Sequence, residues 1–328
     1  YQTSIGAHHH RTANKQPLKS PVKPITEFLK DKGYYTALGC GYWRKTDLNF
    51  EEEGLFDGKD WKERKPNQPF FAQITLGVTH RPFRHDKKNP VDPDKVKVPP
   101  YYPDTQVIRR DWANYLETIQ IMDRQVGKIV SRLKKEGLSD NTLLIFVGDN
   151  GRCHLRAKQW LYDSGIHVPL IMSWPKKMPA GRRELNMVST IDISPTILKL
   201  AGIEVPSYMQ GRVIFGDKTE PRDAIYAARD RCDANPDRIR CVRTNKFKYI
   251  KNFRSELPYT QFSHYKEFYY PAIHHLRALA KKDGLTEAQA KFLADTKPQE
   301  ELYDIVNDPY ELINRAENPD YKKILADL

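Results

Sequence analysis

The most regular pattern of apolar residues lies between residues 107 and 136. Apolar side chains recur there at steps of three and four residues, which places them on one side of an α-helix. The residues of this stripe are Trp112, Tyr115, Leu116, Ile119, Met122, Val126, Ile129, Val130 and Leu133. Gly137 follows and is expected to end the helix. The pattern therefore predicts a long amphipathic helix whose apolar stripe faces a core.

Shorter segments predict strands that alternate with further helices. Strands are predicted at residues 34–43, 69–78, 143–147 and 168–174, where residues are aromatic and β-prone or continuously apolar. Helices are predicted at residues 22–33, ended by Gly33, and 189–203, entered near Asp192 and ended by Gly202. The runs at 69–78 and 143–147 are expected to be buried strands. This alternation predicts an α/β fold built on a mostly parallel sheet.

Beyond about residue 220 the pattern changes to short strands around one helix. The predicted strands lie within residues 223–229, 239–253 and 301–311, and the helix covers 286–294. We therefore divide the chain into a main α/β domain, residues 1–219, and a smaller C-terminal α+β subdomain, residues 220–328.

The length of the apolar runs and the net charge limit which kinds of protein and of binding partner are compatible with the sequence. The chain has 328 residues and no run of eighteen apolar residues, so no segment is expected to span a membrane. Its net charge of +12 is compatible with a nucleic acid or with an acidic small substrate. Because the basic residues are scattered and form no nucleic-acid motif, we expect an acidic substrate and no nucleic acid.

The cysteines and a histidine run give weaker signals. None of the four cysteines has the spacing of a zinc site, and Cys232 and Cys241 are either a disulfide or two thiols. Residues 7–11, AHHHR, are expected in a loop near a pocket or as structural filling, because three consecutive histidines rarely bind one ion.

Polar side chains follow three of the predicted strands. Lys45-Thr46-Asp47, Thr79-His80-Arg81 and Asp149-Asn150 come directly after them, and Lys158 lies in the next connection. In open α/β sheets the loops at the carboxyl ends of strands form the functional sites. Any one of these residues has an ordinary alternative, such as a solvated lysine or a structural histidine. Their convergence predicts a site that surrounds a tetrahedral anion with positive charge and a divalent ion.

Asp149 and Asn150 offer neighbouring carboxylate and amide oxygens. Such hard ligands suit calcium or magnesium. The alternative is an Asx turn that ends the strand, and the tripeptide alone favours that turn.

Together these segments resemble the type I sulfatases of the alkaline-phosphatase-like superfamily, and among them the heparan N-sulfatase (sulfamidase)-like proteins. The segments that carry the resemblance run in family order: YQTSIGAHHHR, GYYTALGCGYWRKTDLNF, PFFAQITLGVTHRPF, YLETIQIMDRQVGKIVSRLKKEGLSDNTLLIFVGDNG, AKQWLYDSGIHVPLIMSWP, STIDISPTILKLAGI and EELYDIVNDPYE. The resemblance implies a large, mostly parallel mixed sheet between helices, a formylglycine nucleophile and one Ca²⁺.

The resemblance also implies roles for individual residues. Asp149 and Asn150 match calcium ligands, and His80 matches the histidine that meets the sulfate and assists the leaving group. Lys45 matches the lysine beside the nucleophile, and Lys158 matches the basic residue that binds sulfate oxygens.

Four further residues are expected to contact the substrate. They are Asp47, Arg152, His154 and Arg156, of which the last three lie between the metal pair and Lys158. Asp47 stands where the family often has a histidine, so the proton-transfer role of that histidine is not carried over.

Two family features are absent from residues 1–328. The sequence has no Cys-x-Pro-Ser-Arg or Ser-x-Pro-Ser-Arg motif, and it lacks the early Asp-Asp calcium pair. Both are expected upstream of Tyr1, so this chain alone is expected to be inactive.

The substrate class follows from charge and resemblance. We expect a sulfated carbohydrate, namely a glucosamine N-sulfate or a related glycosaminoglycan unit, in a periplasmic, secreted or lysosomal protein. The alternatives are a non-catalytic sulfatase-like protein that binds glycans and a phosphoesterase of the same superfamily.

Overall fold

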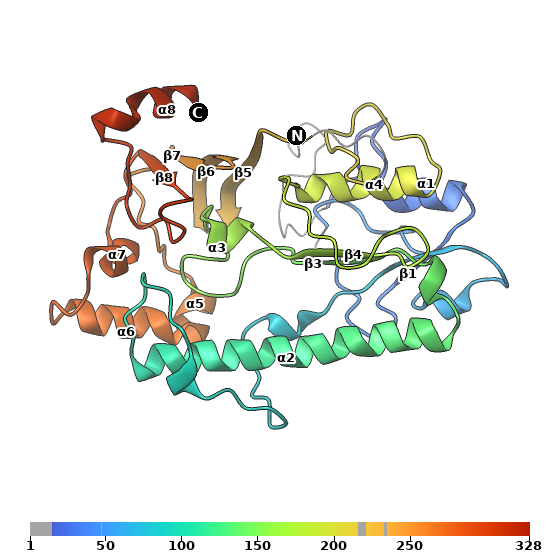
Figure 1. Ribbon diagram of the computed structural model, residues 1–328, viewed down its shortest axis with the longest axis horizontal. Coiled ribbons are helices and arrows are strands. Elements are labelled where there is room, and N and C mark those ends of the chain that lie inside the picture. The colour runs from blue at the N-terminus through green and yellow to red at the C-terminus, as the bar shows by residue number, and fades with distance from the viewer. Residues whose placement is uncertain (1–14, 47, 216–220, 233–234) are drawn as a thin grey trace. The chain divides into compact units, whose positions relative to one another are not determined.

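A computed structural model describes residues 15–46, 48–215, 221–232 and 235–328 (Figure 1). The chain separates into two compact units. The first unit contains residues 1–77 and 186–225, and the second contains 78–185 and 226–328. This division runs through the main domain expected from the sequence, and the domain boundary after residue 219 stays a prediction.

The first unit places helices beside a parallel pair of strands. Its elements are α1 (Ile25–Asp31), β1 (Tyr35–Leu38), β2 (Phe70–Gln73) and α4 (Ile193–Leu200). β1 and β2 are parallel, with Tyr35 opposite Phe70. α1 contacts α4 (Figure 1). Both predicted helices are confirmed, and Gly33 and Gly202 follow them with φ of +88° and +70°. Both strands are shorter than predicted.

The second unit begins with the long helix and an antiparallel strand pair. These elements are α2 (Gln106–Lys135), β3 (Leu144–Val147), α3 (Asp163–Ile166) and β4 (Leu170–Ser173). β3 and β4 pair antiparallel, with Leu144 opposite Ser173. The mixed α/β class is therefore confirmed, with one parallel and one antiparallel pair among these strands. Full burial was wrong for β2 and β3, because every residue of both strands retains some exposure.

The C-terminal part of this unit is a four-stranded sheet with short helices. The strands, in sheet order, are β5 (Ala224–Cys232), β6 (Asn235–Thr244), β7 (Phe247–Asn252) and β8 (Glu300–Asp304). The helices are α5 (His264–Tyr269), α6 (Pro271–Ala280), α7 (Glu287–Ala290) and α8 (Lys322–Asp327). The predicted strands and the helix near residue 290 are confirmed, whereas α5, α6 and α8 were not predicted. In the described residues no helix has the length and apolar character that a membrane crossing requires.

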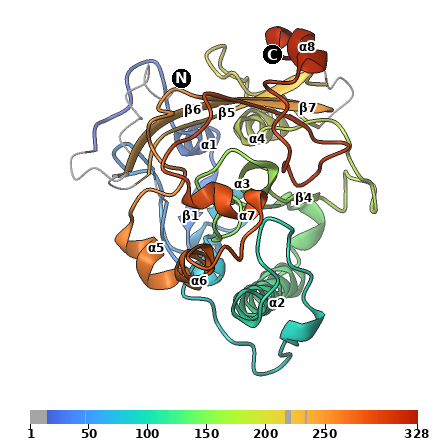
Figure 2. The same cartoon turned by 90° about the vertical axis from the view of Figure 1, so that its left-hand side faces the viewer.

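The core of the second unit surrounds the chain between residues 153 and 162. α6 lies beside α2 (Figure 2). The Thr105 hydroxyl lies 2.8 Å from Nε2 of His275 on α6. The core joins residues of α2, α6, the four-stranded sheet and the 153–162 segment, including Trp112, Ile273, Leu276, Ile250, Tyr303, Leu155, Trp160 and Tyr162. The segment that follows β3 is therefore part of the core over much of its length.

Helix α2 buries two carboxylates beside its apolar stripe. Asp111 and Glu117 are both buried, while Leu116, a member of the predicted stripe, is 36% exposed. Glu117 accepts hydrogen bonds from the backbone of Asp86 (2.7 Å) and Val91 (2.9 Å). Burial acts to raise the pKa of Glu117, but these two backbone bonds and the His85 side chain outweigh it and hold the pKa below its usual range. The backbone of the loop that contains Asp86 and Val91 thus allows a carboxylate to be buried on this helix, because a buried carboxylate is tolerated where hydrogen-bond donors surround it.

A second buried carboxylate, Glu301 of β8, lies within the core. It accepts hydrogen bonds from the hydroxyls of Tyr162 (2.7 Å) and Tyr303 (2.5 Å) and forms an ion pair with Lys291 (2.9 Å). Burial acts to raise its pKa, but the Lys291 charge and these hydrogen bonds outweigh it and lower the pKa to about 2. The carboxylate is therefore ionised at neutral pH and stabilises the folded chain.

We expect this stabilisation to disappear in acid. The usual pKa of the group is 4.5 and the folded value is about 2, so the contribution is complete above 4.5 and is lost as pH falls toward 2. Its full size is on the order of 3 kcal/mol. Urea unfolding of the wild type and of Glu301→Gln, between about pH 7 and about pH 3, measures it. The wild type should be more stable at neutral pH, and the difference should shrink in acid; a difference independent of pH would contradict the assignment.

Candidate active site

His80 lies just after β2 in the chain and has one ring nitrogen held by its surroundings. Its Nδ1 atom is 3.0 Å from the carbonyl oxygen of Arg81 and 3.1 Å from the hydroxyl of Tyr265. Because a carbonyl oxygen only accepts hydrogen bonds, we assign the hydrogen of the neutral ring to Nδ1. Nε2 is then the nitrogen that can take up or release a proton at a ligand. The ring is half-buried, so it retains access to solvent.

The neighbouring Arg81 fixes this histidine in the second unit. Its buried guanidinium forms a bidentate pair with Asp111 of α2, with distances of 2.7 and 2.6 Å. It also donates to the carbonyl oxygens of Cys153 (2.6 Å) and Tyr269 (2.8 Å). One side chain thus joins α2, the segment after β3 and the end of α5.

The Arg81–Asp111 pair was not identified from the sequence. The available signal was an acidic residue beside Trp112 on the buried side of a helix, which requires a partner.

Asp149-Asn150-Gly151 forms a tight bend at the end of β3. The side-chain amide of Asn150 donates to the carbonyl of Gly151 at 2.7 Å, and the Gly151 N–H donates to Gly165 at 2.8 Å. A Cβ atom at Gly151 would lie 2.1 Å from the carbonyl oxygen of Ser164, so only glycine fits here. The carboxylate of Asp149 is exposed. The bend therefore presents a carboxylate outward from a constrained backbone.

Asp149 and Asn150 offer the oxygen ligands that calcium prefers, but they supply only a few of the ligands it needs. Asp149 offers carboxylate oxygens, and Asn150 uses its amide nitrogen in the bend, which leaves its oxygen to accept or coordinate. Calcium takes six to eight oxygen ligands. Among the described residues, no three His, Cys, Asp or Glu side chains are grouped to hold a metal. The pair can therefore form only part of a calcium site.

Lys158 approaches the same place from the other end of the segment. Its side chain is half-buried, and its backbone N–H bonds the Arg152 carbonyl at 3.1 Å. Burial raises the pKa of the Cys153 thiol; the positive charges of Lys158 and Arg81 oppose that shift, and the Asp149 carboxylate adds to it. The charges of Lys158, Arg81 and Asp149 thus all act on Cys153, whose carbonyl oxygen accepts a hydrogen bond from Arg81.

His154 and Arg156 lie in the core instead of facing a substrate. His154 stacks on Trp112 with ring centroids 4.5 Å apart, and burial lowers its pKa well below the usual range. The buried Arg156 donates to the carbonyls of Tyr310 (2.9 Å) and Glu311 (2.5 Å). The predicted substrate contact is therefore not supported for these two residues. The sequence shows only that His154 and Arg156 stand close to other basic residues. It does not show that this segment passes through the core.

Arg152 is partly accessible, unlike the buried His154 and Arg156. Its Nη2 atom donates to the Tyr101 hydroxyl at 2.6 Å, and its guanidinium lies over Trp112 at 4.8 Å. The side chain is half-buried, so part of it remains accessible beside the candidate site.

The remaining sequence candidates belong to the first unit or lie outside the description. Lys45 is exposed, and its carbonyl accepts a hydrogen bond from Thr75 at 2.8 Å. Asp47 and the histidines of residues 7–11 lie outside the described residues. None of the four cysteines is in a disulfide, so the thiol alternative for Cys232 and Cys241 is the one observed.

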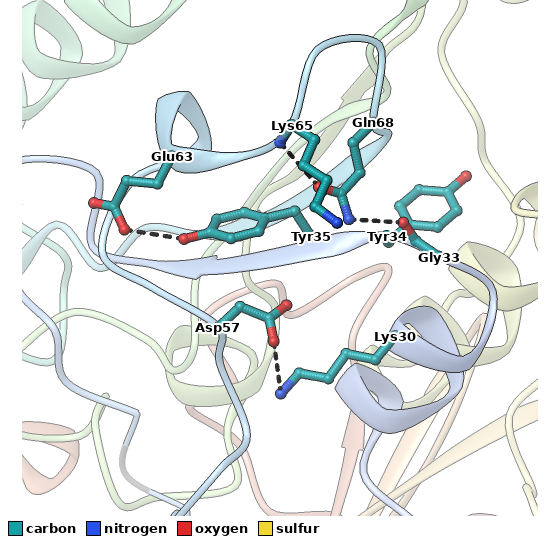
Figure 3. A pocket seen from close by; sticks show the side chains of 8 residues that line it. All are labelled: Lys30, Gly33, Tyr34, Tyr35, Asp57, Glu63, Lys65 and Gln68. Carbon is teal, nitrogen blue, oxygen red and sulfur yellow. Dashed lines mark hydrogen bonds and ion pairs between the residues drawn. The ribbon is translucent and has the colours of Figure 1, made fainter.

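The first unit also contains an open pocket of about 410 Å³ (Figure 3). Its lining residues are Lys30, Gly33, Tyr34, Tyr35, Asp57, Glu63, Lys65 and Gln68. Asp57 pairs with Lys30 at 3.1 Å, and Glu63 accepts from the Tyr35 hydroxyl at 2.9 Å (Figure 3). The pocket includes none of the candidates from the sequence, and both of its carboxylates are bound by neighbouring side chains.

Comparisons with known proteins place this chain among sulfatases. The family model described as Sulfatase matches residues 40–203, and the model N-sulphoglucosamine sulphohydrolase, C-terminal, matches residues 151–262. An ulvan-active sulfatase of Formosa agariphila is 33% identical over the whole chain and 63% of its own length. N-sulphoglucosamine sulphohydrolase of Homo sapiens is 29% identical over 71% of this chain and 49% of its own length. Residues 1–328 thus span less than two thirds of these relatives.

A solved structure supports the same fold. A protein in complex with its substrate D-glucosamine-2-N,6-O-disulfate matches with a TM-score of 0.61 at 16% identity, over 100% of this chain and 83% of that chain. This likeness supports the α/β fold of the chain. With the family model covering half of its residues, the chain belongs to the sulfatase family.

Proposed function

We propose that the protein hydrolyses a sulfate ester or sulfamate on a glycosaminoglycan-type carbohydrate. The observation that carries the proposal is the arrangement around Cys153. There His80 has a ring nitrogen available for proton transfer, its neighbour Arg81 binds the Cys153 carbonyl, and the charges of Lys158 and Asp149 act on the Cys153 thiol. An anion-binding lysine, a proton donor and a metal-ligating carboxylate are the groups that such a hydrolysis requires.

The leaving group determines what His80 does. When the S–O or S–N bond breaks, the bonding electron pair stays on the sugar oxygen or nitrogen, which then needs a proton. Protonated His80 can donate that proton from Nε2, while the Arg81 carbonyl holds Nδ1–H. Lys158 would stabilise the negative charge on the sulfate oxygens. A formylglycine would supply the nucleophile for the attack on sulfur.

The nucleophile is proposed to lie outside residues 1–328. This stretch contains no cysteine or serine in the Cys/Ser-x-Pro-Ser-Arg context. Residues 1–328 alone are therefore proposed to be inactive, and Lys45 is proposed to act beside the nucleophile in the full-length protein. The presence of a Cys/Ser-x-Pro-Ser-Arg motif in the full coding sequence would favour an enzyme. Its absence would favour a glycan-binding protein without catalytic activity.

The substrate proposal combines charge with the names of the relatives. One relative is named for N-sulphoglucosamine, and one solved structure holds a disulfated glucosamine as its substrate. The net charge of +12 would attract such an anionic sugar. We propose an N-sulfated glucosamine or a related glycosaminoglycan unit. Turnover of a phosphate diester, with no glycan turned over, would favour the phosphoesterase alternative instead.

His80→Ala and Lys158→Ala should each lower kcat of the full-length protein by about a hundredfold or more. The physical reason is the loss of a proton donor in one variant and of a positive charge beside the sulfate in the other. An aryl sulfate assay measures the effect, and thermal unfolding is followed in parallel. His167→Ala, which removes an exposed histidine elsewhere in the second unit, is the matched control. Normal kcat in the His80 variant, with only a lowered Tm, would make His80 structural.

Calcium binding should depend on the charge of Asp149. In the full-length protein, Asp149→Asn keeps one oxygen ligand but removes a negative charge, so the calcium Kd should rise by at least about tenfold. Isothermal titration calorimetry measures it, with the exposed Asp140→Asn as a control. Residues 1–328 alone should bind calcium weakly because they supply only two of the ligand side chains. Tight binding by that shorter chain, or an unchanged Kd in Asp149→Asn, would place the metal elsewhere.

A further inference from the structure

Helix α5 carries three aromatic residues on one side. Tyr265, Phe268 and Tyr269 are three and four positions apart, which places them on the same face of a helix. The ring centroids of Tyr265 and Tyr269 are 5.2 Å apart, and those of Phe268 and Tyr269 are 4.8 Å apart. We call these three residues the aromatic side of α5. They form a continuous set of ring contacts.

The aromatic side of α5 begins at the candidate proton donor. Tyr265 contacts the His80 ring with centroids 5.4 Å apart, and its hydroxyl lies 3.1 Å from Nδ1. Arg81 holds the carbonyl of Tyr269 at 2.8 Å. The arginine that positions His80 therefore also fixes the aromatic side relative to it.

The outer end of the aromatic side is open to solvent. Phe268 is 80% exposed, although the exposure of its apolar ring to water is unfavourable. Tyr265 and Tyr269 are half-buried, so the three rings form a partly exposed apolar surface that begins at His80, and such a surface beside a functional group is a candidate binding surface. The neighbouring carboxylate of Glu267 is bound by Arg277 at 2.6 and 2.8 Å, so it presents no unpaired negative charge to an anionic ligand. The surface thus combines aromatic rings with a neighbouring carboxylate, Glu267, whose charge is neutralised by Arg277.

We propose that the aromatic side of α5 is a carbohydrate subsite that seats the pyranose ring next to the sulfated one. A pyranose presents a face of C–H bonds that packs on an aromatic ring, while its hydroxyls remain in water. Tyr265 and Phe268 are three residues apart, about 4.5 Å along the helix axis, which is comparable to the size of one sugar ring. The subsite rests on the proposed function, because its distance from His80 has meaning only if His80 acts on the sulfated sugar.

The test compares substrates that do and do not reach this surface. In the full-length protein, Phe268→Ala should raise KM for an N-sulfated heparin tetrasaccharide by about tenfold, with kcat retained. The KM and kcat for a small aryl sulfate should not change, because that substrate has no second sugar. Phe268→Trp should keep the wild-type KM. Tyr226→Ala on β5 is the matched control, since this aromatic residue is 75% exposed and lies outside α5.

Each other outcome would overturn the subsite. An unchanged tetrasaccharide KM in Phe268→Ala would do so, as would an equal change for the aryl sulfate. A shift in sedimentation coefficient without a change in KM would assign the surface to a second copy of the chain. If the wild type turns over no glycan, the proposed function fails, and calorimetric binding of the same tetrasaccharide decides the subsite separately. Equal binding by wild type and Phe268→Ala would then reject it.

Discussion

The buried ion pair of Arg81 and Asp111 is the contact on which the second unit depends. A buried charge is strongly unfavourable unless a partner and hydrogen bonds compensate it. Here the guanidinium meets both carboxylate oxygens and two backbone carbonyls, from Cys153 and Tyr269. Because these partners come from α2, the segment after β3 and α5, the pair holds three distant parts of the chain in one geometry.

The candidate site follows from this geometry. His80 precedes Arg81 directly, so fixing the arginine also limits where the imidazole can lie. The Gly151 bend and Lys158 flank residues 153–157, all of which are buried. A rigid segment with polar ends is a suitable support for groups that must meet an anion, because their geometry does not have to be ordered on binding. Tyr265 completes the set by contacting the His80 ring from α5.

Local signals in the sequence predicted the elements better than the roles of individual charges. The apolar spacing between residues 107 and 136 and the glycine after it correctly predicted α2 and its end. The same sequence suggested that His154 and Arg156 face a substrate, whereas both are buried. Whether a charged residue faces water depends on partners far away in the chain, such as the carbonyls of Tyr310 and Glu311. Spacing along the chain carries no information about those contacts.

A double-mutant cycle on the ion pair tests the central claim most directly. Arg81→Leu and Asp111→Leu should each lower the free energy of unfolding by about 3–5 kcal/mol, because each leaves the other charge buried without its partner. The double variant should lose much less than the sum, with a coupling energy of at least about 2 kcal/mol. Urea unfolding of the four proteins gives this coupling. Additive losses would contradict the account, because they would mean that the pair does not hold the second unit together.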